Sequence, residues 1–370
     1  MQSFAFNSFE SRTIFGAGSL QRVRSEIEGL GARRVMLVHG GAATKAADAI
    51  AAQLDDRLAL RWNRVAQHVP VPLAQDAREA AGNSAIDAIV CVGGGSAIGL
   101  GKAVALTHGV PLVAVPTTYS GSEQTAIYGL TGDHHKETGD DPRVRPQVVL
   151  YDPDLTLGLP IEISVPSAFN ALAHSIEALW APGSNPFASS VAIESVRHIS
   201  AALPAVRARP SDPEARSQLL LGAAMAGMAL GWTATGLHHK ICHVLGGMLN
   251  LIHADTHSVV LPHVLAFNAP AIPETMARLA SALEVPPGSE AEALWDLAIV
   301  TGAPTRLADL KSSHGTLNRG DLSRVAAAVD LGANPRPVTS ADVLGLLETA
   351  FDGSRPSSSA YPLPDRQVSE

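Results

Sequence analysis

In the first half of the chain, short and continuously apolar runs alternate with helical segments, and this alternation constrains the fold more than any other feature. Four runs have the length and composition of strands: residues 34–39, 87–92, 111–115 and 148–151. Helical patterns follow the first two runs, over residues 44–54 and through about residue 106. Strands that are apolar on both faces and separated by helices belong to parallel sheets covered on both sides. The sequence therefore predicts an α/β domain with a parallel sheet, which we place at residues 1–158.

The periodicity of apolar residues changes after Asp152 and Pro153. From about residue 164 to residue 351, apolar residues recur at three- and four-residue spacing, which is typical of packed helices. The clearest helical segments are 170–180, 192–203, 214–231 and 290–300. We therefore predict an all-helical second domain over residues 159–352. Residues 353–370 are rich in Ser and Pro, which is the composition of a flexible tail.

Length and bulk composition limit the class of protein. A chain of 370 residues exceeds one ordinary core, which favours two domains. The net charge of −8 disfavours a nucleic-acid or anionic-membrane partner, although a locally cationic pocket can still bind a small anionic substrate. The two cysteines, Cys91 and Cys242, lie in apolar stretches and do not suggest a disulfide framework. With no recognisable signal peptide or membrane span, we expect a cytoplasmic protein.

A glycine-rich turn follows the second predicted strand. Gly93, Gly94, Gly95 and Ser96 lie between that strand and a helix, and Lys102 follows on the helix. Glycines allow a pyrophosphate to approach the backbone closely, and a helix N-terminus presents free N–H groups to an anion. Ser96 is a candidate N-cap of the helix. We predict a phosphate-binding loop, although a tight turn without a ligand can have the same composition.

A second polar loop, over residues 116–123, follows the third predicted strand. Its hydroxyl groups belong to Thr117, Thr118, Ser120 and Ser122. Both loops would lie at the carboxyl ends of parallel strands, where open α/β sheets bind ligands. The predicted cofactor contacts of this domain are Gly94, Gly95, Ser96, Lys102, Thr117, Thr118, Ser120, Ser122 and His39.

His39 stands where a dinucleotide-binding domain often carries a carboxylate. That carboxylate selects NADH by accepting a hydrogen bond from the ribose 2′-hydroxyl. Here the first predicted strand ends in His39, and Gly40 and Gly41 follow it. Because no acid stands at this point, a 2′-phosphate is not repelled. We therefore expect the cofactor to be NADH or NADPH.

The helical half carries histidines at spacings that bring them to shared helix faces. Asn170 and His174 are four residues apart on one predicted helix, as are His239 and His243 on another, and His253 and His257 follow. Two uses compete for such a cluster. Imidazoles with a carboxylate or amide can hold a divalent metal, and imidazolium groups can stabilise an anionic transition state and deliver a proton.

Four motifs together resemble the iron-containing alcohol dehydrogenase family over nearly the whole chain. They are the Phe-Gly-Ala-Gly turn at 15–18, the glycine-rich loop with its lysine at 93–102, the Pro-Thr-Thr loop at 116–123, and the Tyr-Asp-Pro sequence at 151–153. Gly99 departs from the resemblance, since the family usually has Asp there. The resemblance implies a Rossmann-like domain followed by an all-α domain, as in dehydroquinate synthase. It also implies a nicotinamide cofactor and a homodimer.

The resemblance implies four metal-ligand positions, which are Asn170, His174, His239 and His253. The family has Asp at the first of them, and an amide oxygen is a weaker, uncharged ligand for a hard cation. On this ground we expect a divalent metal to be unlikely. Asn170 to His174, together with residues 236–243 and 253–257, resembles the maleylacetate reductase branch of the family. This branch implies reduction of the carbon–carbon double bond of maleylacetate to 3-oxoadipate.

The candidate site residues follow from this reading. We expect catalytic roles for His174, His239, His243 and His253, and substrate contacts from Asn170, Lys240 and His257. The alternative is a metal-dependent alcohol dehydrogenase that acts on a small alcohol or aldehyde. A lyase of the dehydroquinate synthase type, which consumes no NADH, and a non-catalytic nucleotide-binding protein are more distant alternatives.

Overall fold

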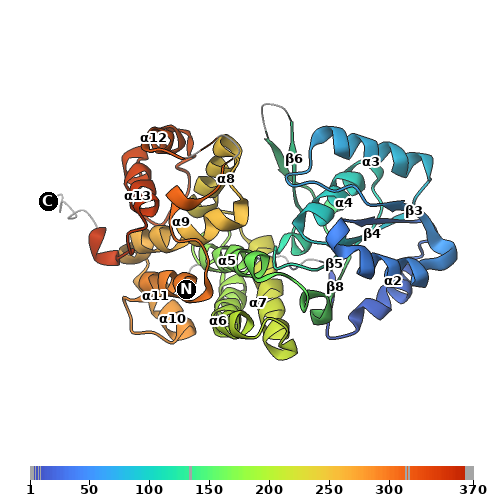
Figure 1. The fold of residues 1–370 in the computed structure, drawn as a ribbon, viewed down its shortest axis with the longest axis horizontal. Helices are drawn as coiled ribbons and strands as arrows, with labels where there is room; N and C mark the ends of the chain where they lie inside the picture. The colour runs from blue at the N-terminus through green and yellow to red at the C-terminus, as the bar shows by residue number, and fades with distance from the viewer. Residues whose placement is uncertain are drawn as a thin grey trace.

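The computed structural model describes residues 4, 6, 8, 10–132, 136–312, 315 and 317–362. The chain forms an α/β domain followed by a helical domain, and the two lie side by side along the long axis of the molecule (Figure 1). The change of architecture occurs between residues 151 and 161, where the last strand of the sheet ends and the first long helix begins. This confirms the predicted fold class.

The first domain is built on a six-stranded sheet with the order β1-β8-β5-β4-β2-β3. Its strands are β1 (Arg12–Phe15), β2 (Val35–His39), β3 (Leu58–Trp62), β4 (Ala88–Gly93), β5 (Leu112–Pro116) and β8 (Val148–Tyr151). Every pairing in the sheet is parallel. The four predicted runs correspond to β2, β4, β5 and β8. The two strands that were not predicted, β1 and β3, form the edges of the sheet.

Helices cover both faces of the sheet. They are α1 (Val23–Gly29), α2 (Thr44–Leu54), α3 (Val71–Asn83) and α4 (Gly95–His108). Because side chains alternate along a strand, Val35 and Leu37 of β2 pack with α1 and α2, whereas Met36 and Val38 pack with α3 and α4. The continuous apolar character of β2 follows from burial on both sides.

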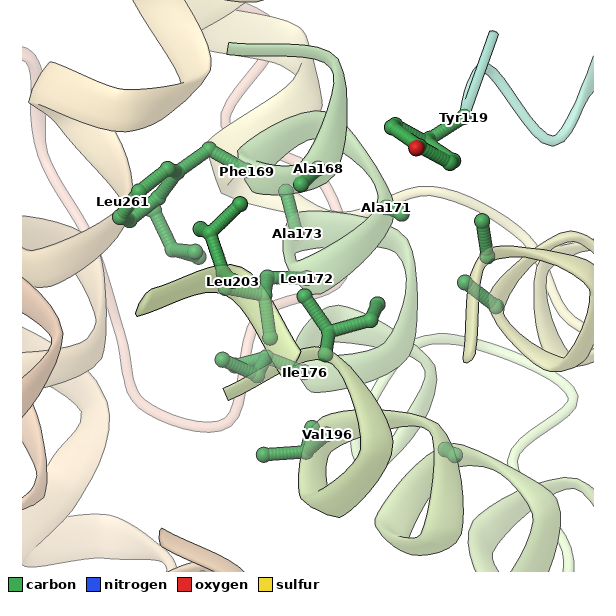
Figure 2. Packing of buried hydrophobic residues seen from close by; sticks show 14 of the residues in the cluster. Tyr119, Ala168, Phe169, Ala171, Leu172, Ala173, Ile176, Val196, Leu203 and Leu261 are labelled. Atoms are coloured by element: carbon green, nitrogen blue, oxygen red, sulfur yellow. The ribbon is translucent and has the colours of Figure 1, made fainter. Parts of the chain in front are cut away.

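The second domain contains nine long helices among the described residues. They are α5 (Ile161–Ala178), α6 (Pro186–Ala208), α7 (Pro213–Trp232), α8 (Leu237–Leu249), α9 (His253–Asn268), α10 (Pro273–Leu283), α11 (Glu290–Thr301), α12 (Arg319–Ala328) and α13 (Ser340–Asp352). Helix α5 is buried from Ser164 to Ala178, and Figure 2 shows Phe169, Leu172 and Ile176 directed from it into the core. An interior helix of this kind presents a fixed platform for polar side chains.

A small antiparallel hairpin, β6 (Ile127–Thr131) and β7 (Lys136–Asp140), leaves the main sheet after the loop that follows β5. It had not been predicted. The end of β6 that precedes the turn is fixed by a backbone hydrogen bond from the Thr131 N–H to the Val69 carbonyl oxygen, at 3.1 Å.

The loop that follows β5 joins the two domains. The backbone N–H of Tyr119 donates to Ser167 Oγ of α5 at 3.0 Å, and the Arg216 guanidinium of α7 donates to the Tyr119 hydroxyl at 2.9 Å. The side chain of Tyr119 faces α5 in Figure 2. A Cβ atom at Gly227 of α7 would lie 2.7 Å from the Gly121 carbonyl oxygen. The backbones of α7 and the loop can therefore come this close only because both residues at the contact are glycines.

Part of the segment that had been predicted to be a flexible tail makes defined contacts with the helical domain. The Arg336 guanidinium donates to the Tyr361 carbonyl oxygen at 2.8 Å, and the Tyr361 ring packs edge-on against Phe267 with ring centroids 5.6 Å apart. Residues 363–370 lie outside the described residues. In the described part of the chain, no single helix is long and apolar enough to cross a membrane; α7 and α8 meet that test only together, with a bend of 99° between them.

Candidate active site

Six histidines from three helices lie in one continuous group beside the domain boundary. His174 of α5 stacks on His239 of α8 with ring centroids 5.0 Å apart, and His243 stacks on His253 of α9 at 5.5 Å. His239 and His243 connect the two pairs at 6.2 Å. The i,i+4 spacing on α8 places His239 and His243 on one face. The structure therefore brings together all four histidines for which catalytic roles were predicted.

His257 and His238 form a deeper layer of this group. His257 Nε2 lies 3.0 Å from His253 Nε2, and His257 Nδ1 lies 2.7 Å from His238 Nε2. Both nitrogens of the His257 ring are therefore occupied by other histidines. This geometry supports His257 as a residue that orients His253, and it gives no support to the predicted contact between His257 and a substrate.

Glu177 is a member of the site that the sequence analysis missed. It lies one turn beyond His174 on the same face of α5, and its Oε2 atom accepts from His239 Nδ1 at 2.5 Å. Its Oε1 atom accepts from the backbone N–H of His238 at 2.8 Å. The signal in the sequence was the spacing of Asn170, His174 and Glu177, which repeats at four and three residues and so marks one helix face.

The carboxylate of Glu177 determines the hydrogen position on His239. An ionised carboxylate only accepts hydrogen bonds, so Nδ1 of His239 carries the hydrogen. Burial acts to raise the pKa of Glu177, but the charge of His239 and its hydrogen bond outweigh burial and lower that pKa to about 2. In the neutral ring, Nε2 of His239 then carries a lone pair, which is the form that a metal ligand or a proton acceptor needs.

The exposure of the histidine rings increases from the inner side of the group to the side that faces solvent. His243 is exposed and His253 is half-buried, whereas the rings of His174, His238 and His257 are buried. Burial, with the charges of neighbouring histidines, lowers the pKa of His174 and His257 well below the usual range and that of His238 to about 3. The three inner rings are thus neutral near pH 7, and the outer pair faces water.

Three polar atoms at the predicted ligand positions are buried without a hydrogen-bond partner among the described residues. They are Asn170 Oδ1, His174 Nδ1 and His239 Nε2. A buried polar atom that lacks a partner is costly, and a bound ion is an ordinary way to satisfy it. An amide oxygen and imidazole nitrogens are donors that divalent metals accept. The residues at these positions therefore fit a metal ion.

The two predicted cofactor loops lie against each other at the carboxyl ends of β4 and β5. A Cβ atom at Gly94 would lie 3.0 Å from Thr118 Cγ2, and one at Gly95 would lie 3.6 Å from Ser120 Cβ. The second loop also reaches the histidines, because Asn170 Nδ2 donates to the Ser120 carbonyl oxygen at 3.3 Å. The loops that were predicted to hold a coenzyme thus continue into the histidine group.

Two residues of these loops have roles that differ from those predicted. The N-cap of α4 is Gly94, and Ser96 lies within the first turn rather than capping it. Lys102 is fully buried, and its ammonium donates to the carbonyl oxygens of Ser122, Thr125 and Ile127 at 2.7–2.9 Å. Burial lowers its pKa to about 7. Lys102 therefore supports the Ser122 loop from within, and these contacts give no support to a direct role at a phosphate.

The structure does not bring Lys240 to the histidine group. Its ammonium forms an ion pair with Asp330 at 2.6 Å. The predicted contact between Lys240 and a substrate carboxylate is therefore not supported by the geometry.

Two family models match this chain from one end of the described structure almost to the other. The iron-containing alcohol dehydrogenase model matches residues 10–153, and the C-terminal model of the Fe-containing alcohol dehydrogenase family matches residues 164–351. The chain belongs to the iron-containing alcohol dehydrogenase family. As a member of this family it is an oxidoreductase, and the two models divide at the same place as its two domains.

Relatives within the iron-containing alcohol dehydrogenase family are similar over nearly their whole length. The maleylacetate reductase of Burkholderia cepacia is 44% identical, and the match covers 96% of this chain and 100% of that protein. The crystal structure of maleylacetate reductase from Rhizobium sp. strain MTP-10005 has a TM-score of 0.90 at 41% identity, covering 96% and 100%. An iron-containing alcohol dehydrogenase from Corynebacterium glutamicum has a TM-score of 0.89 at 40% identity, covering 96% and 99%.

Family membership corrects the expectation that a divalent metal is unlikely. That expectation gave most weight to Asn170, where the family usually has Asp, but the iron-containing family model covers both domains. The unpartnered atoms of Asn170, His174 and His239 agree with the correction. The physical reason is that a metal is held by its whole set of donors, so the loss of one charge weakens the site without removing it.

Proposed function

We propose that this protein reduces the carbon–carbon double bond of maleylacetate to give 3-oxoadipate, with NADH or NADPH as reductant, in the degradation of aromatic compounds. The observation that carries the proposal is the near full-length similarity to maleylacetate reductases at 40–44% identity. The histidine group supports it, because this reaction places negative charge on a ketone oxygen and then needs a proton.

The reaction transfers one hydride and one proton. A hydride adds to the alkene carbon that is β to the ketone, the π electrons move onto the ketone oxygen, and the resulting enolate is protonated at its α carbon. When bound, a reduced nicotinamide would supply the hydride, and a divalent metal at Asn170, His174, His239 and His253 would supply positive charge for the ketone oxygen.

The outer and inner histidines have different parts in this proposal. His243 faces solvent, so it is the candidate to deliver a proton to the enolate carbon and regain it from water. His239 is oriented by Glu177, and His253 by His257. The buried neutral rings of His174 and His238 exclude water from the inner side. Asn170 links this group to the Ser120 loop and so aligns coenzyme and substrate.

The proposed setting of the enzyme follows from its chemistry and its relatives. The dicarboxylate substrate is a small anion, so binding needs local positive charge on a chain whose net charge is −8. We place the enzyme in the cytoplasm, which agrees with two buried free cysteines. We expect it to act as a homodimer, without a nucleic-acid or membrane partner.

The test is oxidation of NADH and NADPH in the presence of maleylacetate, compared with simple aldehydes, on protein of measured metal content. We expect turnover with maleylacetate and accumulation of 3-oxoadipate. The alternative is a metal-dependent alcohol dehydrogenase for a small alcohol or aldehyde, and the unpartnered donors at Asn170 and His239 are compatible with it. Turnover of aldehydes alone would favour that alternative.

A further inference from the structure

The edge of the sheet formed by β2 and β3 carries a positive group where the adenosine half of a dinucleotide would lie. The chain runs from β2 outward to β3, then returns to β4 on the other side of β2. Ligands of open α/β sheets bind outside the carboxyl ends of the strands at such a change of direction. The glycine-rich loop after β4 would hold the pyrophosphate there, and the end of β2 would then face the adenosine ribose.

No carboxylate stands at the end of β2, where the strand finishes in His39. The residues that follow the strand are Gly40 and Gly41, and a Cβ atom at Gly40 would lie 2.8 Å from Val65 Cγ2. Any side chain at position 40, including the acid that selects a free ribose hydroxyl, would require Val65 to move. The end of β2 therefore lacks the acid that usually selects NADH.

Arg61 of β3 supplies positive charge at the same point. Its Nε atom donates to His39 Nε2 at 3.0 Å, and its Nη2 atom forms an ion pair with Asp48 of α2 at 2.7 Å. His39 Nδ1 lies 3.0 Å from the Gly40 carbonyl oxygen. A carbonyl oxygen only accepts, so Nδ1 carries the hydrogen, and Nε2 accepts from Arg61. His39 is thus a neutral, buried support, and the cation at this edge is Arg61.

We propose that Arg61, oriented by His39, binds the 2′-phosphate of NADPH and makes NADPH the preferred coenzyme. The inference rests on the proposed use of a nicotinamide dinucleotide. Arg61 is exposed, and its described bonds use Nε and Nη2, which leaves the N–H groups of Nη1 to donate to a phosphate. Asp48 opposes the effect as a carboxylate, but it is 59% exposed and hydrated.

The test compares two ligands that differ only in the 2′-phosphate, adenosine 2′,5′-bisphosphate and 5′-AMP, by titration calorimetry. The full chain is expected to bind the bisphosphate about 10- to 100-fold more tightly, as for a charge-assisted contact. Arg61→Ala is expected to remove this preference and leave 5′-AMP binding unchanged. Asp48→Asn is expected to increase the preference. Arg57→Ala, at the amino end of β3, is the matched control and is expected to change neither affinity.

Two results would overturn the proposal: equal binding of both ligands by the unmodified protein, or an equal loss of both in Arg61→Ala. Because the titration needs no turnover, it is independent of the substrate. Absence of maleylacetate reduction together with an Arg61-dependent preference would reject the proposed function alone. The same variants assayed with NADPH and NADH should change kcat/KM for NADPH only.

Discussion

Glu177 shows how one side chain governs the chemistry of its neighbour. It accepts the Nδ1 hydrogen of His239, and its second oxygen is held by the backbone at His238. Carboxylates that orient a histidine ligand in this way typically contribute about 10- to 100-fold to metal affinity or activity. The metal-ligand position at His239 therefore depends on Glu177, a residue that we do not expect to touch substrate or coenzyme.

Replacement of Glu177 by Gln should expose this dependence. The amide can still pair with Nδ1, but it no longer supplies a charge or a firm choice of tautomer. We expect metal affinity, measured by competition with a chromogenic chelator, to fall about 10- to 100-fold, with a matching fall in kcat. Glu162→Gln, an exposed position on the same helix, is the control. Unchanged metal affinity in Glu177→Gln would show that the pair is merely structural.

Asn170 provides a test in the opposite direction. Its Oδ1 atom is buried without a described partner, at a position where the family usually carries a carboxylate. Asn170→Asp adds a negative charge to the donor set, so we expect tighter binding of a divalent metal in the same assay. The hydrogen bond from Asn170 to the Ser120 carbonyl oxygen is lost in this variant, so kcat should not rise in parallel. Weaker metal binding would contradict the assignment of this position.

The residue-level predictions succeeded where helical spacing alone determines proximity. The four-residue spacings of His174 with Asn170 and of His243 with His239 placed each pair correctly. Spacing does not reveal which residues of separate helices meet, so the contacts of Glu177 with α8 and of Lys240 with Asp330 were not foreseen. Spacing also did not reveal that His39 is buried and accepts from Arg61, a partner from another strand; its contact with the coenzyme stays a prediction.

At the scale of elements, the loop after β5 is the link between the domains. It approaches α7 so closely that only glycine fits at Gly121 and Gly227, and it contacts α5 through Ser120. The predicted coenzyme loops and the histidines belong to different domains, so their alignment depends on this contact. A small displacement of the loop from α7 should lower the catalytic rate strongly, even where it changes the unfolding free energy little.

Gly227→Ala tests this contact. The added methyl group would lie 2.7 Å from the Gly121 carbonyl oxygen and 3.0 Å from its Cα atom, which forces the loop away. We expect a loss of about 1–3 kcal/mol in unfolding free energy, measured by urea denaturation, and a rise in KM for the coenzyme. Gly345→Ala on α13 is the control, since its Cβ meets nothing within 4 Å, and it should be neutral or stabilising. Equal behaviour of the two variants would contradict the account.

Strands could be predicted where both of their faces are buried, because the apolar run in the sequence is then continuous. Strands β2, β4, β5 and β8 are apolar on both faces, and they were recognised. Strand β3 is half-exposed along most of its length and β1 has a single buried residue, so neither carries a continuous apolar run. The β6–β7 hairpin was missed because its strands are only partly buried, and its position depends on contacts with Val69 that no local pattern contains.

At the scale of the whole molecule, buried neutral histidines make stability depend on pH. In the unfolded chain His238 takes up a proton near pH 6.5, whereas in the folded protein its pKa is about 3. Between these values the unfolded state binds more protons, so unfolding free energy falls as pH falls, by about 1.4 kcal/mol per pH unit for each such group. The full contribution is present above about pH 6.5.

Urea unfolding of the unmodified protein and of His238→Gln between pH 5 and pH 8 checks this expectation. The variant lacks one titrating group, so its stability should fall less steeply below pH 6.5. His263→Gln should behave similarly, because burial lowers the pKa of His263 to about 4 at a site away from the histidine group. Parallel curves for all three proteins would show that these rings do not carry the pH dependence.

In the proposed reaction, the coenzyme transfers a hydride to the carbon–carbon double bond of maleylacetate and leaves the ketone intact. The most direct measurement is the NMR spectrum of the product formed from maleylacetate with coenzyme deuterated at the transferring position of its nicotinamide. We expect 3-oxoadipate with one deuterium on the methylene carbon β to its ketone. Deuterium on a carbinol carbon, in a hydroxy acid that has lost the ketone, would contradict it.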